Sequence, residues 1–406
     1  MSNTGGRTRR EIMADAAKMA AAASVAGLAG CFPDVGGRWA PVCVDPDAGA
    51  NDAGTPRQVT PTVVEVSNPA SVDANSVIQR DVVAAMLDAG LVALAKQAAL
   101  FDATLPAPTA GALESAPDDT SDSDGGVEDG GADASDAGGG ADSPWRVLLP
   151  NYRAGMTIGL KVNCLNQYLP TSPALVHAII VSLRDKLGVD PAKIVVWDRR
   201  LDELNNHGKY STDDLAGAQL LGTVLRTPQD GGVPETSSEG QPGYGDIISP
   251  TILCQSPRLS RILTDHTQLT INCPVLKTHG VSGITAAMKN IYGIIDIPSA
   301  YHRPLLESGL PRLYALPQIR NSISLNICDA LIAVVNGDTD VSPNDMPRRI
   351  LLAQDPVAMD SYALTLVNQR RAALNIPKPV DPTVTGWLDK AEALGLGTQT
   401  FSLIQV

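Results

Sequence analysis

The residues best suited to chemistry in this 406-residue sequence gather between Lys277 and His302. His279 and His302, two of only five histidines, flank Lys289, and Lys277 lies two positions before His279. Imidazole side chains transfer protons near neutral pH and also bind metal ions. This grouping predicts that His279, His302 and Lys289 are catalytic residues.

The same stretch has the features of an anion-binding site. Thr285, Lys289 and Tyr292 follow the spacing i, i+4, i+7, which predicts one face of a helix beginning at Thr285. A glycine-rich turn before a helix offers backbone N–H groups to a phosphate or carboxylate. A surface helix with ordinary lysines has the same pattern, so this alternative stays open. We favour a small anionic ligand, because the positive groups stand together in an acidic protein.

The surrounding sequence alternates short apolar runs with helical segments. The runs lie at 63–66, 156–162, 194–197, 269–271, 323–327 and 350–353, and a helix is predicted over 173–187 with Ser172 as its cap. Only 3 Phe, 4 Trp and 8 Tyr are present, so any core consists mainly of aliphatic side chains. This pattern predicts an α/β fold, with a mostly parallel sheet and helices on both faces.

In parallel sheets, ligands bind beyond the carboxyl ends of the strands. Polar side chains follow every predicted strand here, including Asp198 after 194–197 and Asp329 after 323–328. Single examples are helix caps or solvated loops, but together they indicate a polar cleft. The predicted ligand-binding residues are Lys161, Asn163, Lys277, Thr285, Asn290 and Asp329.

Other chemistries have weaker support. The histidines together with Asp198, Asp329, Asp355 or Asp360 could bind a metal, but no H-E-x-x-H spacing occurs. No C-x-x-C pair indicates an iron–sulfur cluster, and no G-x-S-x-G elbow or phosphate-binding P-loop is present. The cofactor, if any, therefore stays unknown, as does the question of whether the protein is an enzyme.

The N-terminal residues 1–31 read as an export signal. Arg9 and Arg10 precede an Ala-rich stretch, and Leu28-Ala29-Gly30-Cys31 resembles a lipobox whose cysteine is lipidated. We expect an exported bacterial protein, periplasmic or anchored to a membrane as a lipoprotein, with the export machinery as a partner. No apolar run of 18 residues occurs, so membrane contact is expected only through the lipid anchor.

The remaining chain is predicted to form a single α/β domain over 60–406, after a tether over 32–60. A low-complexity insertion at 113–144 holds ten acidic and no basic residues and is expected to be disordered, and 226–250 reads as a loop insertion. The ten acids account for most of the net charge of −13. No nucleic-acid partner is expected, because the export signal and the absence of a nucleic-acid-binding motif argue against one.

Several segments resemble the domain-of-unknown-function 362 family. They are Gly159-Leu160-Lys161-Val162-Asn163-Cys164, Pro274-Val275-Leu276-Lys277-Thr278-His279, the run from Gly283 to Gly293, Asp329-Ala330-Leu331, and Asp355-Pro356-Val357-Ala358-Met359-Asp360. The resemblance implies one domain from about 60 to 406 and agrees with twin-arginine export. Many relatives carry a ferredoxin-like cysteine module, which this chain lacks. More distantly, the layout is similar to lactate-racemase-like proteins, which implies proton transfer by histidines and a lysine.

These observations lead to one expectation and two alternatives. We expect an exported protein that binds a small phosphate- or carboxylate-bearing ligand in a cleft lined by lysine and histidine. The first alternative is a metal- or cofactor-dependent redox enzyme or isomerase that uses the histidine pair for proton transfer. The second is a surface protein without catalytic activity, in which the acidic tract matters most.

Overall fold

The computed structural model describes residues 30–33, 39–42, 60–102, 143–226, 240–248, 251–253, 255–302 and 305–406. Most of the predicted export signal, tether and acidic insertion lies outside these ranges, as does most of the predicted 226–250 loop. Two short strands, β1 (Gly30–Pro33) and β2 (Trp39–Val42), pair with each other before the main domain. Pro144 begins a helix, so the predicted insertion is one residue too long at this end.

The main sheet has ten strands within the described residues. Eight of them follow the order β14-β3-β13-β12-β9-β4-β5-β6, while β10 pairs with β12 and β11 with β10. Their bounds are β3 Thr62–Ser67, β4 Ile158–Lys161, β5 Ile194–Arg200, β6 Gln219–Val224, β9 Leu269–Asn272, β10 Val275–His279, β11 Gly283–Thr285, β12 Ile323–Val334, β13 Arg349–Ala353 and β14 Ser402–Gln405. Only the pairings made by β13 and β11 are antiparallel. The predicted mostly parallel sheet is confirmed.

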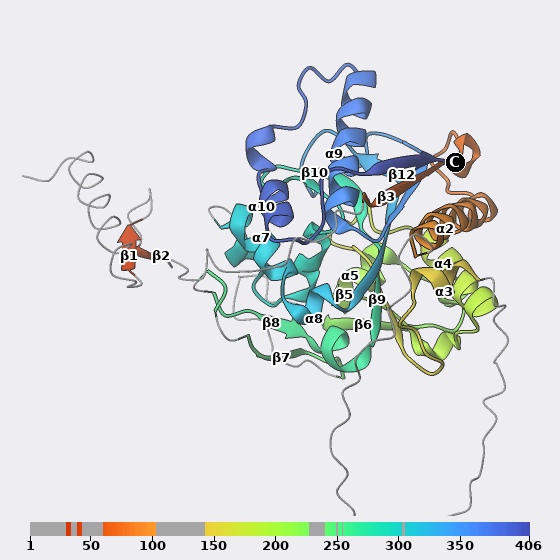
Figure 1. The fold of residues 1–406 in the computed structure, drawn as a ribbon, viewed down its shortest axis with the longest axis horizontal. Coiled ribbons are helices and arrows are strands. Elements are labelled where there is room, and N and C mark those ends of the chain that lie inside the picture. Colours follow the sequence, from red (N-terminus) through yellow and green to blue (C-terminus); the bar gives the residue numbers. More distant parts are fainter. Residues whose placement is uncertain are drawn as a thin grey trace, which may run out of the picture.

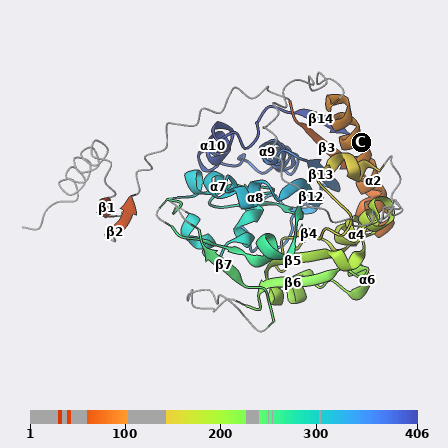
Figure 2. The same cartoon turned by 60° about the horizontal axis from the view of Figure 1, so that its bottom comes forward.

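Side chains that alternate along the strands divide the core into two layers. Ile194 and Val196 of β5 pack into one cluster, and Val195 and Trp197 pack into the other. This period of two is the pattern of a strand buried on both faces. Helices therefore cover the sheet on both sides, as Figures 1 and 2 show.

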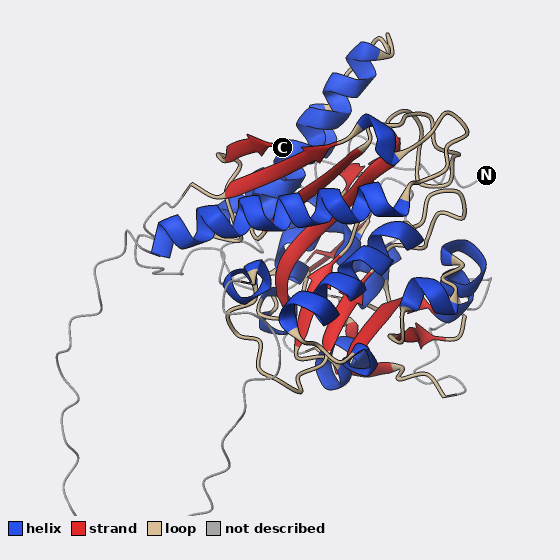
Figure 3. Cartoon of the chain, turned by 90° about the vertical axis from the view of Figure 1, so that its right-hand side faces the viewer, coloured by secondary structure: helices blue, strands red, loops and turns tan. Residues whose placement is uncertain are grey.

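The first layer of helices contains α2 (Arg80–Asp102), α3 (Pro144–Leu148), α4 (Pro173–Leu187) and α6 (Thr212–Leu215). Figure 3 shows the long α2 lying across this face of the sheet. By length and composition its segment Arg80–Leu100 could cross a membrane. In this fold its Leu87 and Leu91 are fully buried in the same cluster as residues of β3 and β13. The apolar stripe of α2 thus serves the core of the domain.

The second layer contains α7 (Leu306–Tyr314), α9 (Pro356–Ala373) and α10 (Trp387–Ala393), with α8 (Pro317–Arg320) beside them. The short segments are α5 (Leu201–Glu203), η1 (Pro69–Ser71), η2 (Pro191–Lys193), η3 (Leu204–Gly208), η4 (Ile262–His266), η5 (Lys289–Ile294), η6 (Pro298–Tyr301) and η7 (Pro382–Val384). A separate hairpin is formed by β7 (Tyr244–Ile247) and β8 (Arg258–Ser260). Part of the predicted loop at 226–250 is therefore a strand.

The ends of α4 agree with their sequence signals. The Ser172 side chain accepts a hydrogen bond from the Leu175 N–H at 3.3 Å, and Pro173 occupies the first turn. Gly188 ends the helix in the left-handed conformation with φ of 75°, which an L side chain adopts only at a cost. Thr171, just before this cap, holds the loop after β4, because its hydroxyl accepts the Asn163 N–H at 2.9 Å.

Candidate functional site

A cavity of about 310 Å³ lies at the carboxyl ends of β4 and β5, beside β10. Its lining comprises Lys161, Asn163, Leu165, Asp198, Arg199, Glu203, Lys277, His279, Thr285, Lys289, Asn290, Tyr292, Gly293, Pro298, Ser299, His302 and Thr339. Eight of the nine residues predicted as catalytic or ligand-binding line this cavity; Asp329 does not. A wider cavity of about 960 Å³ near β7 and α8 is lined by none of them.

The arrangement of β9 and β10 explains how distant residues meet. Both strands run parallel to β12, β9 pairing with its first half and β10 with its second. Since β9 also pairs with β4, the chain after β9 continues beyond the carboxyl end of β4. Lys277 and His279 of β10 are thereby carried to the edge where β4 ends at Lys161.

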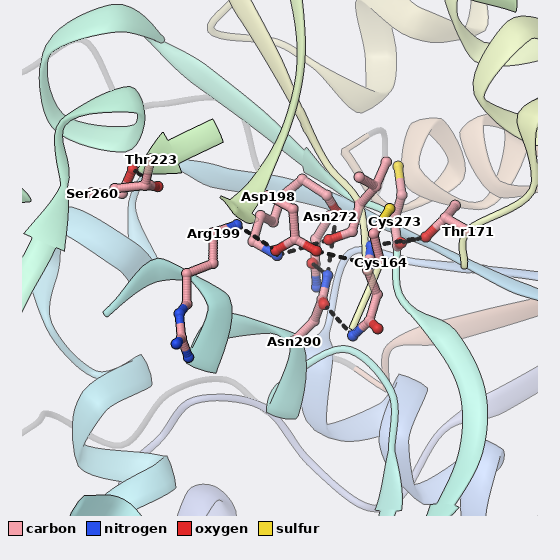
Figure 4. Close-up of polar contacts among 12 residues, drawn as sticks. Cys164, Thr171, Asp198, Arg199, Thr223, Ser260, Asn272, Cys273 and Asn290 are labelled. Atoms are coloured by element: carbon pink, nitrogen blue, oxygen red, sulfur yellow. Dashed lines mark hydrogen bonds and ion pairs between the residues drawn. The ribbon is translucent and has the colours of Figure 1, made fainter. Parts of the chain in front are cut away.

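Lys161 forms a buried ion pair with Asp198. Its Nζ lies 2.7 Å from Asp198 Oδ1 and donates to the Val162 carbonyl, also at 2.7 Å. Asp198 accepts the backbone N–H groups of Cys164 and Arg199, each at 2.7 Å, so its carboxylate is fully engaged (Figure 4). The charge of Lys161 is therefore balanced within the protein before any ligand binds.

A chain of buried asparagines connects the cavity to the sheet. Lys277 Nζ donates to Asn163 Oδ1 at 3.1 Å, and Asn163 Nδ2 donates to Asn290 Oδ1 at 2.9 Å. Asn290 then donates to Asn272, and Asn272 to Asn326. Figure 4 shows Asn290 and Asn272 pointing toward each other. Because each amide has a fixed partner, the chain holds Asn163 with its oxygen toward Lys277.

Two further amines, those of Lys277 and Lys289, are buried without a matching carboxylate. Lys277 is 1% exposed and Lys289 is 6% exposed. In the described part of the chain, no carboxylate lies within ion-pair distance of either amine. Burial lowers the pKa of Lys277 to about 8, although Asp198 opposes the shift. The pKa of Lys289 is well below its usual value, because of burial and then the charge of Lys277. Uncompensated buried positive charge is costly, so this end of the cavity suits an anion.

The two predicted catalytic histidines lie together at this end. Their rings stack with centroids 5.6 Å apart and an interplanar angle of 20°. His279 Nδ1 accepts the Val281 N–H at 3.0 Å, and burial lowers the pKa of His279 to about 4. Burial and the neighbouring Lys289 also lower the pKa of His302. His279 is therefore neutral at pH 7, with Nδ1 as the nitrogen without a proton, and the surroundings of His302 favour its neutral form as well.

His302 has the opposite tautomer. Its Nδ1 lies 3.0 Å from the Pro298 carbonyl, which can only accept, so Nδ1 carries the proton. Its Nε2 lone pair then faces Lys289 Nζ at 3.1 Å. The Tyr292 ring meets His302 edge-on, and its centroid lies 3.5 Å from Lys289 Nζ. Lys289 and His302 are thus a donor–acceptor pair enclosed by aromatic rings.

The predicted helix beginning at Thr285 is wrong. Thr285 ends β11, and only the 3-10 helix η5 follows, from Lys289. The reason lies in α9: the buried carboxylate of Asp360 accepts the N–H groups of Ala287 and Met288 at 2.6 and 3.0 Å. These bonds hold the 285–289 segment in an irregular path that still brings Thr285 and Lys289 to one cavity. The Thr285 hydroxyl has no hydrogen-bond partner among the described residues.

Asp329 also differs from its prediction. Strand β12 continues to Val334, so Asp329 lies inside the strand and not at its exit. Its carboxylate accepts the Ser172 N–H at 2.8 Å and the Leu331 N–H at 3.1 Å. Asp329 therefore fixes the start of α4 and does not line the cavity.

Among the lining residues that the sequence analysis did not predict as site residues are Arg199, Glu203 and Tyr292. Burial and then the nearby Asp198 raise the pKa of Glu203 to about 7, which makes this carboxyl group a proton donor or acceptor near neutral pH. Asp198 and Arg199 follow the predicted 194–197 strand, so the strand-exit rule points to them. Nothing local in the sequence points to Glu203.

Gly293 leaves room for the ion pair between Lys161 and Asp198 at one side of the cavity. A Cβ at this position would lie 2.6 Å from Lys161 Nζ and 2.7 Å from Asp198 Oδ1. Such distances are shorter than real contacts, so the buried ion pair requires a glycine here. The cavity thus has one side at Lys161 and Asp198, where the charges balance, and another at the amines of Lys277 and Lys289, where no carboxylate does so.

The described residues contain no group of three or more His, Cys, Asp or Glu side chains arranged to hold a metal ion. The four aspartates weighed as metal ligands each have another role. Asp198 pairs with Lys161, Asp329 with the start of α4, and Asp360 with the 287–288 backbone. Asp355 caps α9 by accepting the Val357 and Ala358 N–H groups.

Comparisons with known proteins agree with the segments that carry the resemblance. No curated protein matches the chain. A crystal structure of a Thermotoga maritima protein from the Northeast Structural Genomics Consortium aligns at 10% identity with a TM-score of 0.34; this chain spans about half (55%) of that protein, with 54% of its own length aligned. A likeness at this level indicates nothing about function. The model of the family described as "Domain of unknown function (DUF362)" matches residues 158–365, just over half of the chain. The protein therefore belongs to the DUF362 family.

Proposed function

We propose that the protein binds a small anion bearing a phosphate or carboxylate group in the cavity between Lys161 and His302. The observation that carries this proposal is the pair of buried amines, Lys277 and Lys289, which have no carboxylate partner among the described residues. The unpartnered Thr285 hydroxyl adds a hydrogen-bond donor to the same cavity. A volume of about 310 Å³ suits a ligand of metabolite size.

Titration calorimetry tests this proposal with inorganic phosphate, acetate and glycolate as probes. Lys277→Met and Lys289→Met each remove one amine and keep the apolar stem. Loss of a charged hydrogen bond costs about 1.5–3 kcal/mol, so affinity should fall roughly 10- to 100-fold. Lys390→Met is the matched control, because Lys390 is an exposed residue of α10, and it should bind as the unmodified protein does. Equal affinity in the unmodified protein and the three variants, or no binding of any probe, would refute the proposal.

A second function, an isomerase that transfers protons on the bound anion, is favoured by the stacked imidazoles of His279 and His302. His302 has its lone pair on Nε2, as a base requires, whereas His279 carries its proton on Nε2 and can act as a donor, because its Nδ1 accepts the Val281 N–H. Exchange of solvent deuterium into a bound 2-hydroxy or 2-oxo acid would report this activity. His302→Gln should abolish the exchange and leave phosphate binding within a few-fold; exchange at the unmodified rate would contradict the role.

We infer that the protein is exported and anchored through Cys31. Support comes from Arg9 and Arg10, the Ala-rich run and the Leu28-Ala29-Gly30-Cys31 sequence. Labelling with a fatty-acid analogue in the native host should mark the protein, and Cys31→Ser should remove the label. Replacement of Arg9 and Arg10 by Lys should retain the protein in the cytoplasm. Label on the Cys31→Ser variant would refute the anchor.

A further inference from the structure

We propose that Lys289 is a nucleophile that condenses with the carbonyl group of a small oxo acid bound in the cavity. The inference rests on the proposed anion site and specifies its ligand: an anion with an aldehyde or ketone next to its carboxylate. The lysine forms a Schiff base, and His302 moves the protons.

The first argument is the contact between Lys289 and His302. Lys289 Nζ lies 3.1 Å from His302 Nε2, and the Pro298 carbonyl fixes the ring proton on Nδ1. The lone pair of Nε2 therefore points at the amine, which is where a base must lie to take a proton from it. An amine that served only as a positive charge would be expected to face an acceptor oxygen or a carboxylate.

The second argument is the surroundings of Lys289. Its residue is 6% exposed, and Tyr292 covers the amine with its ring centroid 3.5 Å away. The titratable groups that face the amine are Lys277, which is positive, His279 and His302, whose pKa values are lowered, and Asp338, which is negative. Burial and the charge of Lys277 both favour the neutral amine, while Asp338 and the face of the Tyr292 ring favour the ammonium; the pKa of Lys289 is lowered all the same. Desolvation and a nearby cation are the two means by which proteins make a lysine nucleophilic.

The third argument is that Lys277 and Lys289 have different partners and therefore suit different parts of the ligand. Lys277 is tied to Asn163 Oδ1 at 3.1 Å, at the end of the asparagine chain, so it is oriented as a fixed positive charge. Lys289 has no amide or carboxylate partner in the part of the chain that the structure describes. Lys277 and the Thr285 hydroxyl therefore suit the carboxylate of an oxo acid, while Lys289 suits its carbonyl carbon.

The reaction balances without an oxidant or reductant. The neutral Lys289 amine attacks the carbonyl carbon and a C–N bond forms. His302 Nε2 takes one of the two amine protons and passes it to the carbonyl oxygen, which gives the carbinolamine and leaves His302 neutral. His302 then takes the second amine proton and delivers it to the carbinolamine hydroxyl, so the C–O bond breaks and water leaves. The products are the neutral imine and one water, and His302 ends in its starting tautomer.

Reductive trapping tests this step. The full-length protein is incubated with glyoxylate and sodium cyanoborohydride, and the product is analysed by intact mass and peptide mapping. We expect one carboxymethyl group per protein, at Lys289. The modification should be absent from Lys289→Arg, roughly tenfold slower in Lys277→Met, and unchanged in rate in Lys390→Met. Mapping of the unmodified sequence gives the site even if a variant fails to fold.

Glycolate, which has the carboxylate but no carbonyl, separates this inference from the function on which it rests. Calorimetric binding of glycolate together with trapping at Lys289 supports both. Binding of glycolate without an adduct at Lys289 overturns the Schiff base and leaves the anion site. Absence of binding by glycolate and glyoxylate overturns both, and adducts spread over surface lysines alone also overturn the inference.

Discussion

The buried ammonium of Lys277 makes the stability of the protein depend on pH in a way that one substitution isolates. Its pKa is about 8 in the folded protein against 10.5 for an ordinary lysine. Each pH unit between two such values corresponds to about 1.4 kcal/mol, so burial of the charged form costs about 3 kcal/mol. Lys277→Met removes the titrating group and keeps most of the side-chain volume.

The direction of the effect follows from proton binding. Below pH 8 both the folded and the unfolded chain carry the charge, so folding bears the full burial cost. Between pH 8 and 10.5 the unfolded chain binds the proton that the folded chain has released, and stability therefore rises with pH. The free energy of unfolding of the unmodified protein, minus that of Lys277→Met, should rise by about 2.5 kcal/mol from pH 7 to pH 10.

Urea unfolding at pH 7, 8, 9 and 10 measures this difference. Comparing the two proteins at each pH cancels every other titrating group to first order. The Asn163 oxygen loses its donor in the variant, which adds an offset that does not change with pH. The same comparison with Lys390→Met should stay flat within about 0.5 kcal/mol. Saturating phosphate should remove the slope, because the bound anion supplies the missing counter-charge. A difference that does not change with pH would refute the buried, unpaired ammonium.

Three further substitutions test the frame of the cavity. Gly293→Ala places a methyl group 2.6 Å from Lys161 Nζ and 2.7 Å from Asp198 Oδ1, so it should disturb their ion pair and cost about 1–3 kcal/mol in urea unfolding; an unchanged free energy of unfolding would contradict the need for glycine here. Asp198→Asn leaves Lys161 buried without its counter-charge and should cost about 3–5 kcal/mol in urea unfolding, against less than about 0.5 for exposed Asp389→Asn. Asp360→Leu removes the acceptor for two buried backbone N–H groups and should cost at least about 2–4 kcal/mol in the same assay; a neutral effect would mean that the 287–288 backbone is held otherwise.

The sequence predicted the framework well where the signals are local. Ser172 and Gly188 mark the two ends of α4, and the apolar run beginning at Ile194 marks β5. Because parallel strands end at a common edge, the strand-exit rule placed Lys161 and Lys277 at one cavity without knowledge of the strand order.

The errors arise where distant residues decide the local path. Nothing near Thr285 shows that Asp360, on another helix, takes up the 287 and 288 N–H groups and prevents a regular helix there. Asp329 looked like a strand end, but pairing with β10 and β13 extends β12 beyond it. Glu203 was missed because its raised pKa comes from burial and from Asp198, neither of which a local pattern reveals.

The central claim, that a small anion binds against Lys277 and Lys289, is tested most directly by proton uptake at pH 9. At this pH a group with a pKa of about 8 is only about a tenth protonated, so an anion that binds there must draw a proton onto Lys277. Calorimetry of phosphate binding in two buffers of different ionisation enthalpy should give an uptake of about one proton per site or more, because Lys289 also has a lowered pKa. Uptake should be lower by about one proton per site in Lys277→Met, after correction for the titration of phosphate itself. Binding with no net uptake in the unmodified protein would contradict the claim.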